Sequence, residues 1–480
     1  MSEAVAAVDL GATSGRVMLG HVGPDELRVR TVARFANRPV RIRDSLHWNM
    51  LELYREVCAG VERALREADL ASVGIDSWAV DYALLRGGRM LGMPHHYRDD
   101  RNAAAVADVH ELVGPAELYE VNGLQHLPFN TTFQLAADRR TGFLQLADRM
   151  LLIPDLLAYW LTGEQVAERT NASTTGLLDA RTSNWSGALL DRLAVDRNLL
   201  PPLITPGERI GELSPDAAER LGTDGLAVTA VGSHDTASAV VAVPARDESF
   251  AYISCGTWSL VGAELDRPVF SEQGRAANFT NELGVDGRIR YLHNVMGLWL
   301  LTESVEHWRR SDPAIDLESL LAAAAEIPPG RVAEFDPNDA RFLPPGDMPV
   351  RISAWLTEHD LPVPGTRAEF VRCILESLAT AYAESIDLLE RITGRALSTV
   401  HMVGGGSQNA LLCRLTADRT GRLVLAGPVE ATALGNVLVQ ARAVGALRGS
   451  LESMRDLVRR TCTPIRYEPV SSAGAWHGTR

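Results

Sequence analysis

Short apolar runs alternate along the chain with longer segments of helical spacing. The runs at 73–76, 226–231 and 400–403 are followed by glycine or polar residues, a pattern typical of buried strands. A segment from Arg367 to Thr393 instead carries apolar residues three or four positions apart and is followed by Gly394, which indicates a helix and its end. The alternation predicts an α/β fold in which helices pack on sheets.

A second helix is expected from Ala431 to about Val444. Small residues recur along it, among them Ala433, Gly435 and Ala441. Because small side chains allow two backbones to approach closely, we expect this helix to pack tightly against a neighbouring element.

One pattern occurs twice, about half the chain apart. Residues 4–20 and 250–262 each read as a strand, a polar turn with glycine, and a second strand. Such turns present backbone N–H groups and hydroxyls that can bind phosphates, although each could also be a simple hairpin turn. The repetition predicts two domains, 1–244 and 245–480, whose opening hairpins hold the phosphates of a nucleotide.

The composition narrows the chemistry. Of 480 residues, 46% are hydrophobic and 22% are charged, which is typical of a globular protein. The 61 acidic residues outnumber the 47 basic ones, giving a formal charge of −14 that argues against nucleic acid as a partner. The sequence contains no lysine, so it lacks the lysine of a Walker A loop and any Schiff-base lysine.

The cysteines and the N-terminal residues indicate a compartment. Five widely separated cysteines without a CxxC pair predict neither a disulfide framework nor a zinc site. Residues 1–9 lack the pattern of a signal peptide, and no apolar run is long enough to span a membrane. We therefore expect a cytoplasmic protein without a membrane partner, whose oligomeric state the sequence does not predict.

Two aspartates lie at the ends of predicted strands, at positions where α/β enzymes commonly carry functional residues. Asp9 ends a buried strand beside the first glycine turn, and a carboxylate next to phosphates needs a cation such as Mg²⁺ between them. The alternative is a turn-initiating residue. Asp235 follows the strand at 226–231 and begins a helix, where α/β enzymes place catalytic groups, although it could be only a helix cap.

Two further segments suggest ligand contacts. Trp78 lies between Asp76 and Asp81, and an aromatic ring beside carboxylates suits a sugar, whose C–H face packs on the ring. The alternative is an ordinary half-buried strand. The glycine run 404–406 could let a base or ribose approach the backbone, or could be a simple turn.

Taken together in their order along the chain, the motifs resemble those of the FGGY carbohydrate kinases, and most closely those of the rhamnulokinases. The resemblance covers about residues 5–445 and rests on 9–16, 74–81, 97–99, 233–237, 254–259, 278–282, 294–301, 404–409 and 427–436. It implies two ribonuclease H-like domains of the actin/hexokinase type that flank a cleft for ATP and sugar. The N-terminal domain would then bind the sugar and the C-terminal domain the nucleotide.

The resemblance also implies roles for single residues. Asp235 matches the general base of the family. The positions that match ATP contacts are Ala12, Thr13, Ser14, Gly15, Arg16, Thr257, Thr302 and Gly405. Those that match sugar contacts are Ala79, His234, Asp235, Thr236 and Asn294, to which the aromatic-acid pattern adds Trp78 and Asp81. Thr302 departs from the family, since rhamnulokinases have glutamine there.

The activity implied is the transfer of the γ-phosphoryl group of ATP to the C1 hydroxyl of L-rhamnulose, in L-rhamnose catabolism. Mg²⁺ would accompany ATP, with Asp9 reaching it through water. Two alternatives remain. One is a kinase for L-fuculose or D-xylulose, because the base and the phosphate loops belong to the whole superfamily. The other is a non-enzymatic ATPase switch of the actin-like fold, which would have no need of Asp235 or of 78–81.

Overall fold

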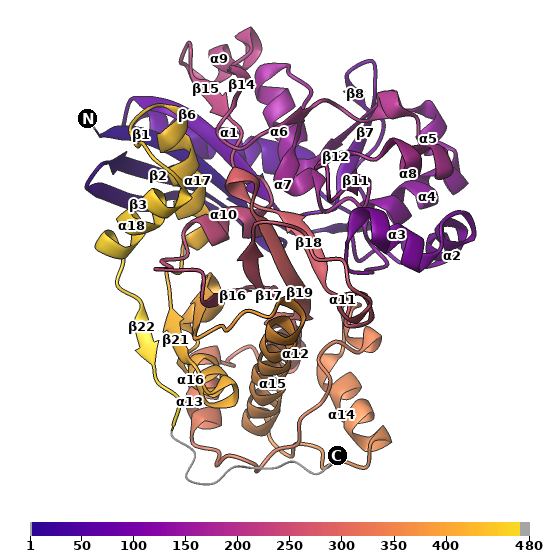
Figure 1. The fold of residues 1–480 in the computed structure, drawn as a ribbon, viewed down its shortest axis with the longest axis vertical. Coiled ribbons are helices and arrows are strands. Elements are labelled where there is room, and N and C mark those ends of the chain that lie inside the picture. The colour runs from indigo at the N-terminus through magenta and orange to yellow at the C-terminus, as the bar shows by residue number, and fades with distance from the viewer. Residues whose placement is uncertain (1, 471–480) are drawn as a thin grey trace. The chain divides into compact units, whose positions relative to one another are not determined.

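The computed structural model describes residues 2–470, which form two compact units (Figure 1). Unit 1 contains residues 2–246, 264–293 and 430–462, and unit 2 contains residues 247–263, 294–429 and 463–470. Residues 1 and 471–480 of the two predicted domains lie outside the described residues. Two segments from the second half of the chain thus fold with the N-terminal half.

The main sheet of unit 1 has six strands in the order β14-β15-β6-β1-β2-β3. Its strands are β1 (Glu3–Leu10), β2 (Ser14–Gly23), β3 (Glu26–Ala36), β6 (Leu70–Ser77), β14 (Arg209–Glu212) and β15 (Ala227–Thr229). β1, β2 and β3 pair antiparallel, whereas β6 pairs parallel with both β1 and β15. The parallel strands β1 and β6 are buried along nearly their whole length, as continuous apolar runs predict.

Two helices of unit 1 matter for the candidate site, α10 (Asp235–Val241) and α17 (Ala431–Ala443), and the unit also contains the longer helix α1 (Met50–Leu65). Unit 1 has further elements besides these helices and the strands of its main sheet. They are β4 (Val40–Ile42), β5 (Ser45–His47), β7 (Tyr82–Arg86), β8 (Arg89–Met90), α2 (Asn102–Leu112), α3 (Pro115–Asn122), α4 (Thr131–Thr141), α5 (Phe143–Leu146), β9 (Arg149–Leu152), α6 (Ile153–Thr162), β10 (Ala167–Glu168), α7 (Arg169–Ala172), β11 (Leu178–Asp179), β12 (Asn184–Trp185), α8 (Gly187–Arg192), η1 (Arg197–Leu199), β13 (Leu203–Ile204), α9 (Pro215–Leu221), α11 (Glu272–Ala276), β18 (Thr280–Leu283), η2 (Val285–Gly287) and α18 (Leu451–Thr461).

A second sheet has seven strands in the order β18-β19-β17-β16-β20-β21-β22; β18 lies in unit 1, whereas β16, β20, β21 and β22 lie in unit 2. Its further strands are β16 (Phe250–Cys255), β17 (Trp258–Leu265), β19 (Ile289–Met296), β20 (Thr399–Val403), β21 (Leu423–Ala426) and β22 (Ile465–Tyr467). The helices of this unit are α12 (Trp299–Ser311), α13 (Leu317–Ala325), η3 (Ala340–Phe342), α14 (Met348–Glu358), α15 (Arg367–Thr393), η4 (Gly405–Gln408) and α16 (Ala410–Thr420). β20 pairs parallel with β16 and β21, so this unit also combines a parallel core with a hairpin.

The helix predicted from Arg367 to Thr393 is confirmed as α15. Thr366 and Glu369 form a capping box at its start, and Gly394 ends it with a φ of 68°, a conformation that glycine adopts at little cost. The expected hairpins are confirmed as β1–β2 and β16–β17. The strand expected at 226–231 is shorter, because only Ala227–Thr229 pairs in the sheet.

The small-residue helix is confirmed as α17, and its close packing has a specific cause. A Cβ atom on Gly435 would lie 1.8 Å from the backbone oxygen of Ser238 in α10. The glycine therefore allows the two helices to touch through their backbones. Farther along α17, Gln440 donates from Nε2 to the backbone oxygen of Ala6 in β1 at 2.9 Å. The helix is thus joined both to α10 and to the sheet.

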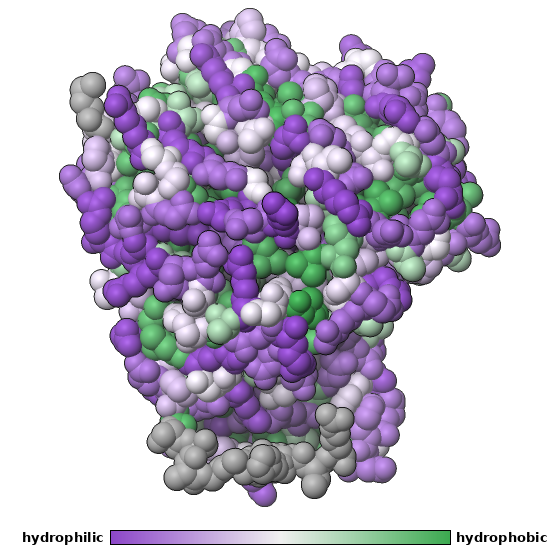
Figure 2. Space-filling view, in the orientation of Figure 1, coloured by the Kyte–Doolittle hydropathy of each residue, from purple (hydrophilic) through white to green (hydrophobic). Residues whose placement is uncertain are grey.

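One face of the protein is predominantly polar. On the face drawn in Figure 2, hydrophilic residues predominate and hydrophobic ones lie between them. Within residues 2–470, none of the helices combines the length and the apolar character that crossing a lipid bilayer requires.

Replacement of Gly435 tests the contact between α10 and α17. Because the added methyl group would overlap the Ser238 carbonyl, Gly435→Ala should lower the free energy of unfolding by about 1–3 kcal/mol, measured by urea denaturation. Thr432→Ala, at a half-buried position of the same helix, should change it by no more than about 0.5 kcal/mol. Equal unfolding midpoints for Gly435→Ala and the unsubstituted protein would contradict the close approach.

Candidate functional site

Two carboxylates meet where β1 and β6 end. Asp9 lies directly opposite Asp76 in the parallel register, and both side chains are buried. Burial raises the pKa of Asp76 well above its usual value, and the neighbouring charge of Asp9 raises it further, against a hydrogen bond from Asn436. Asn436 contacts only Oδ2, at 2.6 Å, while Oδ1 has no hydrogen-bond partner among the described residues. An unpaired oxygen thus lies beside Asp9.

Arg16 is the cation closest to these acids. Its Nε and Nη2 donate to Oδ2 of Asp9 at 2.9 and 2.7 Å, and its Nη1 lies 2.5 Å from Oε2 of Glu430. Glu430 is the residue that precedes α17. One guanidinium therefore joins the end of β1 to the start of α17 and forms ion pairs with both carboxylates.

The turn between β1 and β2 is held by backbone contacts. Gly11 donates its N–H to the oxygen of Ser14 at 2.9 Å, and Asn37 donates its N–H to the oxygen of Thr13 at 3.0 Å. The side chains of Thr13 and Ser14 are exposed, and that of Ala12 is half-buried. A Cβ on Gly15 would overlap the ring of Phe35, so this position needs glycine. The predicted phosphate-loop residues 12–16 therefore form a fixed turn with exposed hydroxyls.

Asp235 is the first residue of α10, and its side chain is 31% exposed. Thr236 donates its backbone N–H to Oδ1 at 2.6 Å, and Nε2 of His234 lies 3.3 Å from the same oxygen. Oδ2 accepts no hydrogen bond within the described part of the chain. Burial raises the pKa of the carboxyl; His234 opposes this rise and Asp9 adds to it. The result is a basic carboxylate with one oxygen open to a ligand.

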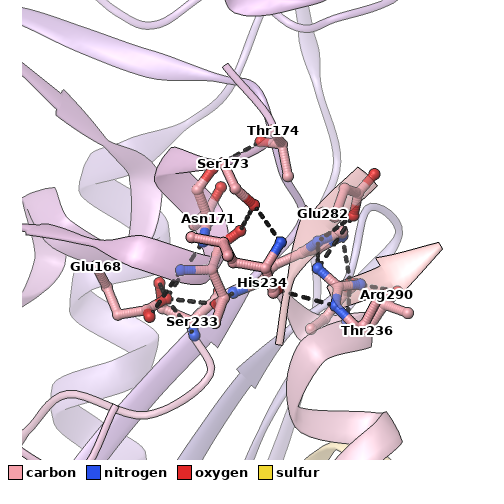
Figure 3. Close-up of polar contacts among 12 residues, drawn as sticks. Glu168, Asn171, Ser173, Thr174, Ser233, His234, Thr236, Glu282 and Arg290 are labelled. Atoms are coloured by element: carbon pink, nitrogen blue, oxygen red, sulfur yellow. Dashed lines mark hydrogen bonds and ion pairs between the residues drawn. The ribbon is translucent and has the colours of Figure 1, made fainter. Parts of the chain in front are cut away.

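The segment that carries Asp235 is fixed by a residue that the sequence did not indicate. Glu168, almost fully buried, accepts hydrogen bonds from the N–H and the Oγ of Ser233 at 2.9 and 2.8 Å (Figure 3). Ser77, at the end of β6, donates its N–H to the oxygen of Ser233 at 2.9 Å. Glu168 also caps the one-turn helix α7, which is too short to give a recognisable pattern. These contacts set the direction in which α10 begins.

Trp78 belongs to a buried aromatic cluster. Only 5% of it is exposed, and its ring centroid lies 4.0 Å from that of the fully buried Trp48. On its other side Trp48 stacks on His96 at 4.1 Å. The structure therefore places one ring face of Trp78 against protein, and its contact with a sugar stays a prediction.

Asp81 holds this cluster together. Its Oδ2 accepts hydrogen bonds from Nε1 of Trp48 at 2.6 Å, Nε1 of Trp78 at 3.1 Å and the N–H of Tyr97 at 3.1 Å. Its Oδ1 accepts one from Nε2 of Gln134 at 2.7 Å. Burial raises the pKa of Asp81 to about 7, although all four donors favour the anion. These hydrogen bonds use both carboxylate oxygens of Asp81. They do not test its expected contact with a sugar hydroxyl, which stays a prediction.

The residues between Trp78 and Asp81 form a strained turn. Val80 has a φ of 67°, which is rare for a β-branched side chain. Thr131 secures the turn by donating from Oγ1 to the oxygen of Val80 at 2.6 Å. Ala79, the predicted sugar contact, is half-buried at this turn. Such strain is often retained where a ligand is bound.

The candidate residues of unit 2 surround the turn between β16 and β17. Thr257 accepts a hydrogen bond from the N–H of Trp299, at the start of α12, at 3.2 Å. Thr302 is exposed in the first turn of that helix. A Cβ on Gly406 would overlap Sγ of Cys255, whereas one on Gly405 would meet nothing within 4 Å. The glycine run therefore lies against the end of β16 with Gly405 accessible.

Asn294 lies near the end of β19 and is half-buried. It is the predicted sugar contact that belongs to unit 2, whereas Ala79, His234, Asp235 and Thr236 belong to unit 1.

Comparisons with known proteins give one consistent result. The models of the N-terminal and C-terminal domains of the FGGY family of carbohydrate kinases match residues 4–242 and 251–444. A curated rhamnulokinase from Bacteroides thetaiotaomicron is 40% identical over 98% of this chain and 96% of its own length. One from Pectobacterium carotovorum subsp. carotovorum is 41% identical over 98% of this chain and 95% of its own.

Solved structures agree in fold. A xylulose kinase from Lactobacillus acidophilus superposes with a TM-score of 0.78 at 16% identity, covering 98% of this chain and 94% of its own. Plasmodium falciparum glycerol kinase with ADP gives a TM-score of 0.76 at 16% identity, with the same coverages. At this identity the likeness concerns the fold alone.

The raised pKa of Asp81 predicts a titration that can be followed in the tryptophan spectrum. As the pH rises through about 7, Asp81 should ionise and strengthen its bonds from both indole N–H groups, which shifts the absorption of Trp48 and Trp78. Because the folded protein holds this proton and the unfolded chain releases it near pH ~4, Asp81 should reduce the stability as the pH rises from about 4 to 7.

Difference absorption spectra between pH 5 and 9 would measure this transition. Asp81→Asn should abolish it, and Asp148→Asn, at an exposed carboxylate of the same unit, should leave it in place. A transition that persists in Asp81→Asn would assign it to another group.

Proposed function

The chain belongs to the FGGY family of carbohydrate kinases, and we propose that it transfers the γ-phosphoryl group of ATP to the C1 hydroxyl of L-rhamnulose. The family resemblance and the two-domain α/β fold class predicted from the sequence are thereby confirmed. Curated rhamnulokinases that are about 40% identical over nearly the whole chain support L-rhamnulose as the sugar. The reaction would provide L-rhamnulose 1-phosphate in L-rhamnose catabolism.

The carboxylate of Asp235 carries the proposal. Its Oδ1 is held by Thr236 and His234, whereas its Oδ2 is left for a substrate hydroxyl. A general base works best when its pKa is near the operating pH, and burial raises the pKa of this carboxyl in that direction. Asp235 would accept the proton of the C1 hydroxyl as its oxygen bonds to the γ-phosphorus, and the bond from this phosphorus to the bridging oxygen of the β-phosphate would break to release ADP.

The proposed sugar contacts lie in the segment that carries Asp235 and in other segments that match the family. His234 and Thr236 flank the base, and Ala79 would offer its backbone at the strained turn. Asn294 completes the set that matches the family. Trp78 is proposed as the aromatic contact and Asp81 as a hydroxyl contact. The bonds that Asp81 already makes would also let it act by holding Trp78.

The phosphates would be held by turns and one arginine. Phosphoryl transfer asks the protein mainly to align the reactants and neutralise charge. Residues 12–15 provide exposed hydroxyls and backbone groups, and Arg16 provides the positive charge. Thr257, Thr302 and Gly405 are the proposed nucleotide contacts of unit 2.

Sugar kinases of this family use ATP with a divalent metal, and we propose Mg²⁺. The residues at the end of β1 fit it, because Asp9 and the unpartnered Oδ1 of Asp76 provide oxygen atoms. Within residues 2–470 no group of three or more His, Cys, Asp or Glu could hold a metal ion. A hydrated Mg²⁺ needs only one or two carboxylates besides phosphate oxygens, so Asp9 would hold it through water. When bound, Mg²⁺ neutralises phosphate charge.

The roles of the two predicted domains, the binding partners and the cellular compartment are also proposals. Residues 1–244 would bind the sugar and 245–480 the nucleotide. Sugar and ATP are small molecules that bind to the family's kinases, and we propose neither nucleic acid nor a membrane as a partner. All five cysteines are free, which suits a reducing compartment such as the cytoplasm.

Replacement of Asp235 tests the base. Because a positioned general base contributes ~10²–10⁴-fold, Asp235→Asn should lower kcat by at least ~100-fold. ATP affinity, measured by titration calorimetry with a non-hydrolysable analogue, should be retained. Asp216→Asn, at an exposed acid in the first turn of α9, is the matched control and should keep normal turnover. Near-normal turnover of Asp235→Asn would remove this residue from the mechanism.

A panel of ketoses tests the substrate. Polar groups left unpaired by a misplaced hydroxyl can discriminate by up to ~10⁴–10⁵-fold, whereas a methyl group contributes ~10–200-fold. Hydroxyl contacts should therefore make kcat/KM highest for L-rhamnulose, lower for its epimer L-fuculose and lower for D-xylulose, measured by coupled ADP detection. A higher value for either competitor would overturn the sugar assignment but not the kinase. ATP turnover that is equally fast without sugar would instead favour the ATPase switch.

A further inference from the structure

Behind Asp235 lies a group of three buried residues, His234, Glu282 and Arg290, which we call the histidine cluster. Glu282 and Arg290 stand opposite each other on β18 and β19 (Figure 3), and the Arg290 side chain has no exposed surface. Nη2 of Arg290 lies 3.1 Å from Nδ1 of His234 and 3.0 Å from Oε2 of Glu282. All three residues belong to unit 1, as does Asp235.

The two nitrogens of the His234 ring face opposite partners. Nδ1 faces Arg290 and Glu282, and Nε2 lies 3.3 Å from Oδ1 of Asp235. A guanidinium only donates hydrogen bonds and a carboxylate only accepts them. If Arg290 donates to Nδ1, that nitrogen carries no proton, so a neutral ring carries its proton on Nε2. That proton then lies on the side of the ring nearest Asp235, whose Oδ1 is 3.3 Å from Nε2.

The opposite tautomer is less consistent with these contacts. With the proton on Nδ1, the ring would donate to Oε2 of Glu282, which lies 3.2 Å away. Nε2 would then present a lone pair to an oxygen of the ionised Asp235, so that two acceptors would face each other. Only a proton on Nε2 satisfies both the Arg290 contact and the Asp235 contact of a neutral ring.

Glu282 keeps Arg290 in place. A buried guanidinium is costly unless a carboxylate neutralises it, and Glu282 does so at 3.0 Å. Burial by itself would raise the pKa of Glu282, but the pKa lies below its usual value, and the charge of Arg290 is the largest cause of this lowering. Arg290 also donates from Nε to the oxygen of Leu283 at 3.1 Å, so two edges of the guanidinium are fixed.

We propose that Arg290, held by Glu282, is a positioning residue of the reaction: it fixes the tautomer of His234 so that Nε2 donates to Oδ1 of Asp235. This inference rests on the proposed role of Asp235 as the base. With its proton on Nε2, the ring presents a positive hydrogen to Oδ1, 3.3 Å from Nε2, which favours the orientation of the carboxylate that turns Oδ2 toward the substrate hydroxyl. Without Arg290, the ring is free to place its proton on Nδ1, and Asp235 loses this donor.

The tautomer can be observed directly. Nitrogen NMR of the full chain labelled with ¹⁵N-histidine distinguishes protonated from unprotonated ring nitrogens, and His234→Gln identifies the resonances of this ring. We expect a protonated Nε2 and an unprotonated Nδ1 at neutral pH. A proton on Nδ1, whether alone or in an imidazolium, would overturn the proposal.

The kinetic test removes both charges of the pair together, because removal of one would leave the other buried and unpaired. Glu282→Leu/Arg290→Met should lower kcat by ~10–100-fold, since small misplacements of a catalytic group can cost ~100-fold, and leave the KM for ATP unchanged. Arg372→Met/Glu376→Leu removes an equally buried pair from α15 and should keep kcat within about twofold. An equal loss of kcat in this control would show that the loss in Glu282→Leu/Arg290→Met comes from general structural damage, and it would overturn the positioning role.

A double-mutant cycle with Asp235→Asn then decides whether the pair acts through the base. If it does, Glu282→Leu/Arg290→Met should lower kcat little further in the Asp235→Asn protein. A full additional loss would overturn the inference while the base role stands. Normal turnover of Asp235→Asn would overturn both, so the two failures are distinguishable. If the double variant does not fold, Arg290→Lys replaces it in the same double-mutant cycle, because lysine keeps the positive charge but lacks the planar guanidinium.

Discussion

The adjacency of Asp9 and Asp76 is the constraint on which much of unit 1 depends. Parallel pairing places both carboxylates at the same level of the sheet, where neither can reach bulk water. Two buried like charges persist only if one is neutral or if cations and donors compensate them. The raised pKa of Asp76 and the paired Arg16 provide both solutions.

The compensating groups come from far along the chain. Asn436 and Glu430 belong to the segment around α17, and they reach the strand ends because Gly435 lets this helix lie directly on α10. A single glycine in one helix thereby affects the charge state of an acid some 360 positions earlier. This explains in physical terms why residues 430–462 fold with the N-terminal half.

Sequence patterns predicted the features that arise from local physics. The helix from Arg367 to Thr393 has a periodic apolar face, a capping box and a terminal glycine, and each of these can be read within a few residues. The hairpins and the position of Asp235 after a strand are local as well. The return of 264–293 and 430–462 to unit 1 depends on contacts between distant residues, for which a single sequence carries no pattern.

Buried charged residues escaped prediction for a related reason. Glu168, Glu282 and Arg290 look like surface residues in the sequence, because charge normally indicates exposure. Only the fold shows that Glu168 accepts bonds from Ser233 and that Arg290 faces a histidine ring. The boundary of β15 was missed because Ala230, although buried, exchanges backbone hydrogen bonds with Gly207 and Glu208, which belong to no strand, and residues 230–231 lead into the turn before Asp235.

Asp81 and Asp235 show how the same side chain acquires two characters from its surroundings. Burial raises the pKa of both. At Asp81, four donors use both oxygens: two indole N–H groups, the N–H of Tyr97 and Nε2 of Gln134. At Asp235, the contacts gather on Oδ1 and leave Oδ2 for a ligand. The direction of the donors, more than the degree of burial, therefore separates an acid that builds a site from one that can react in it.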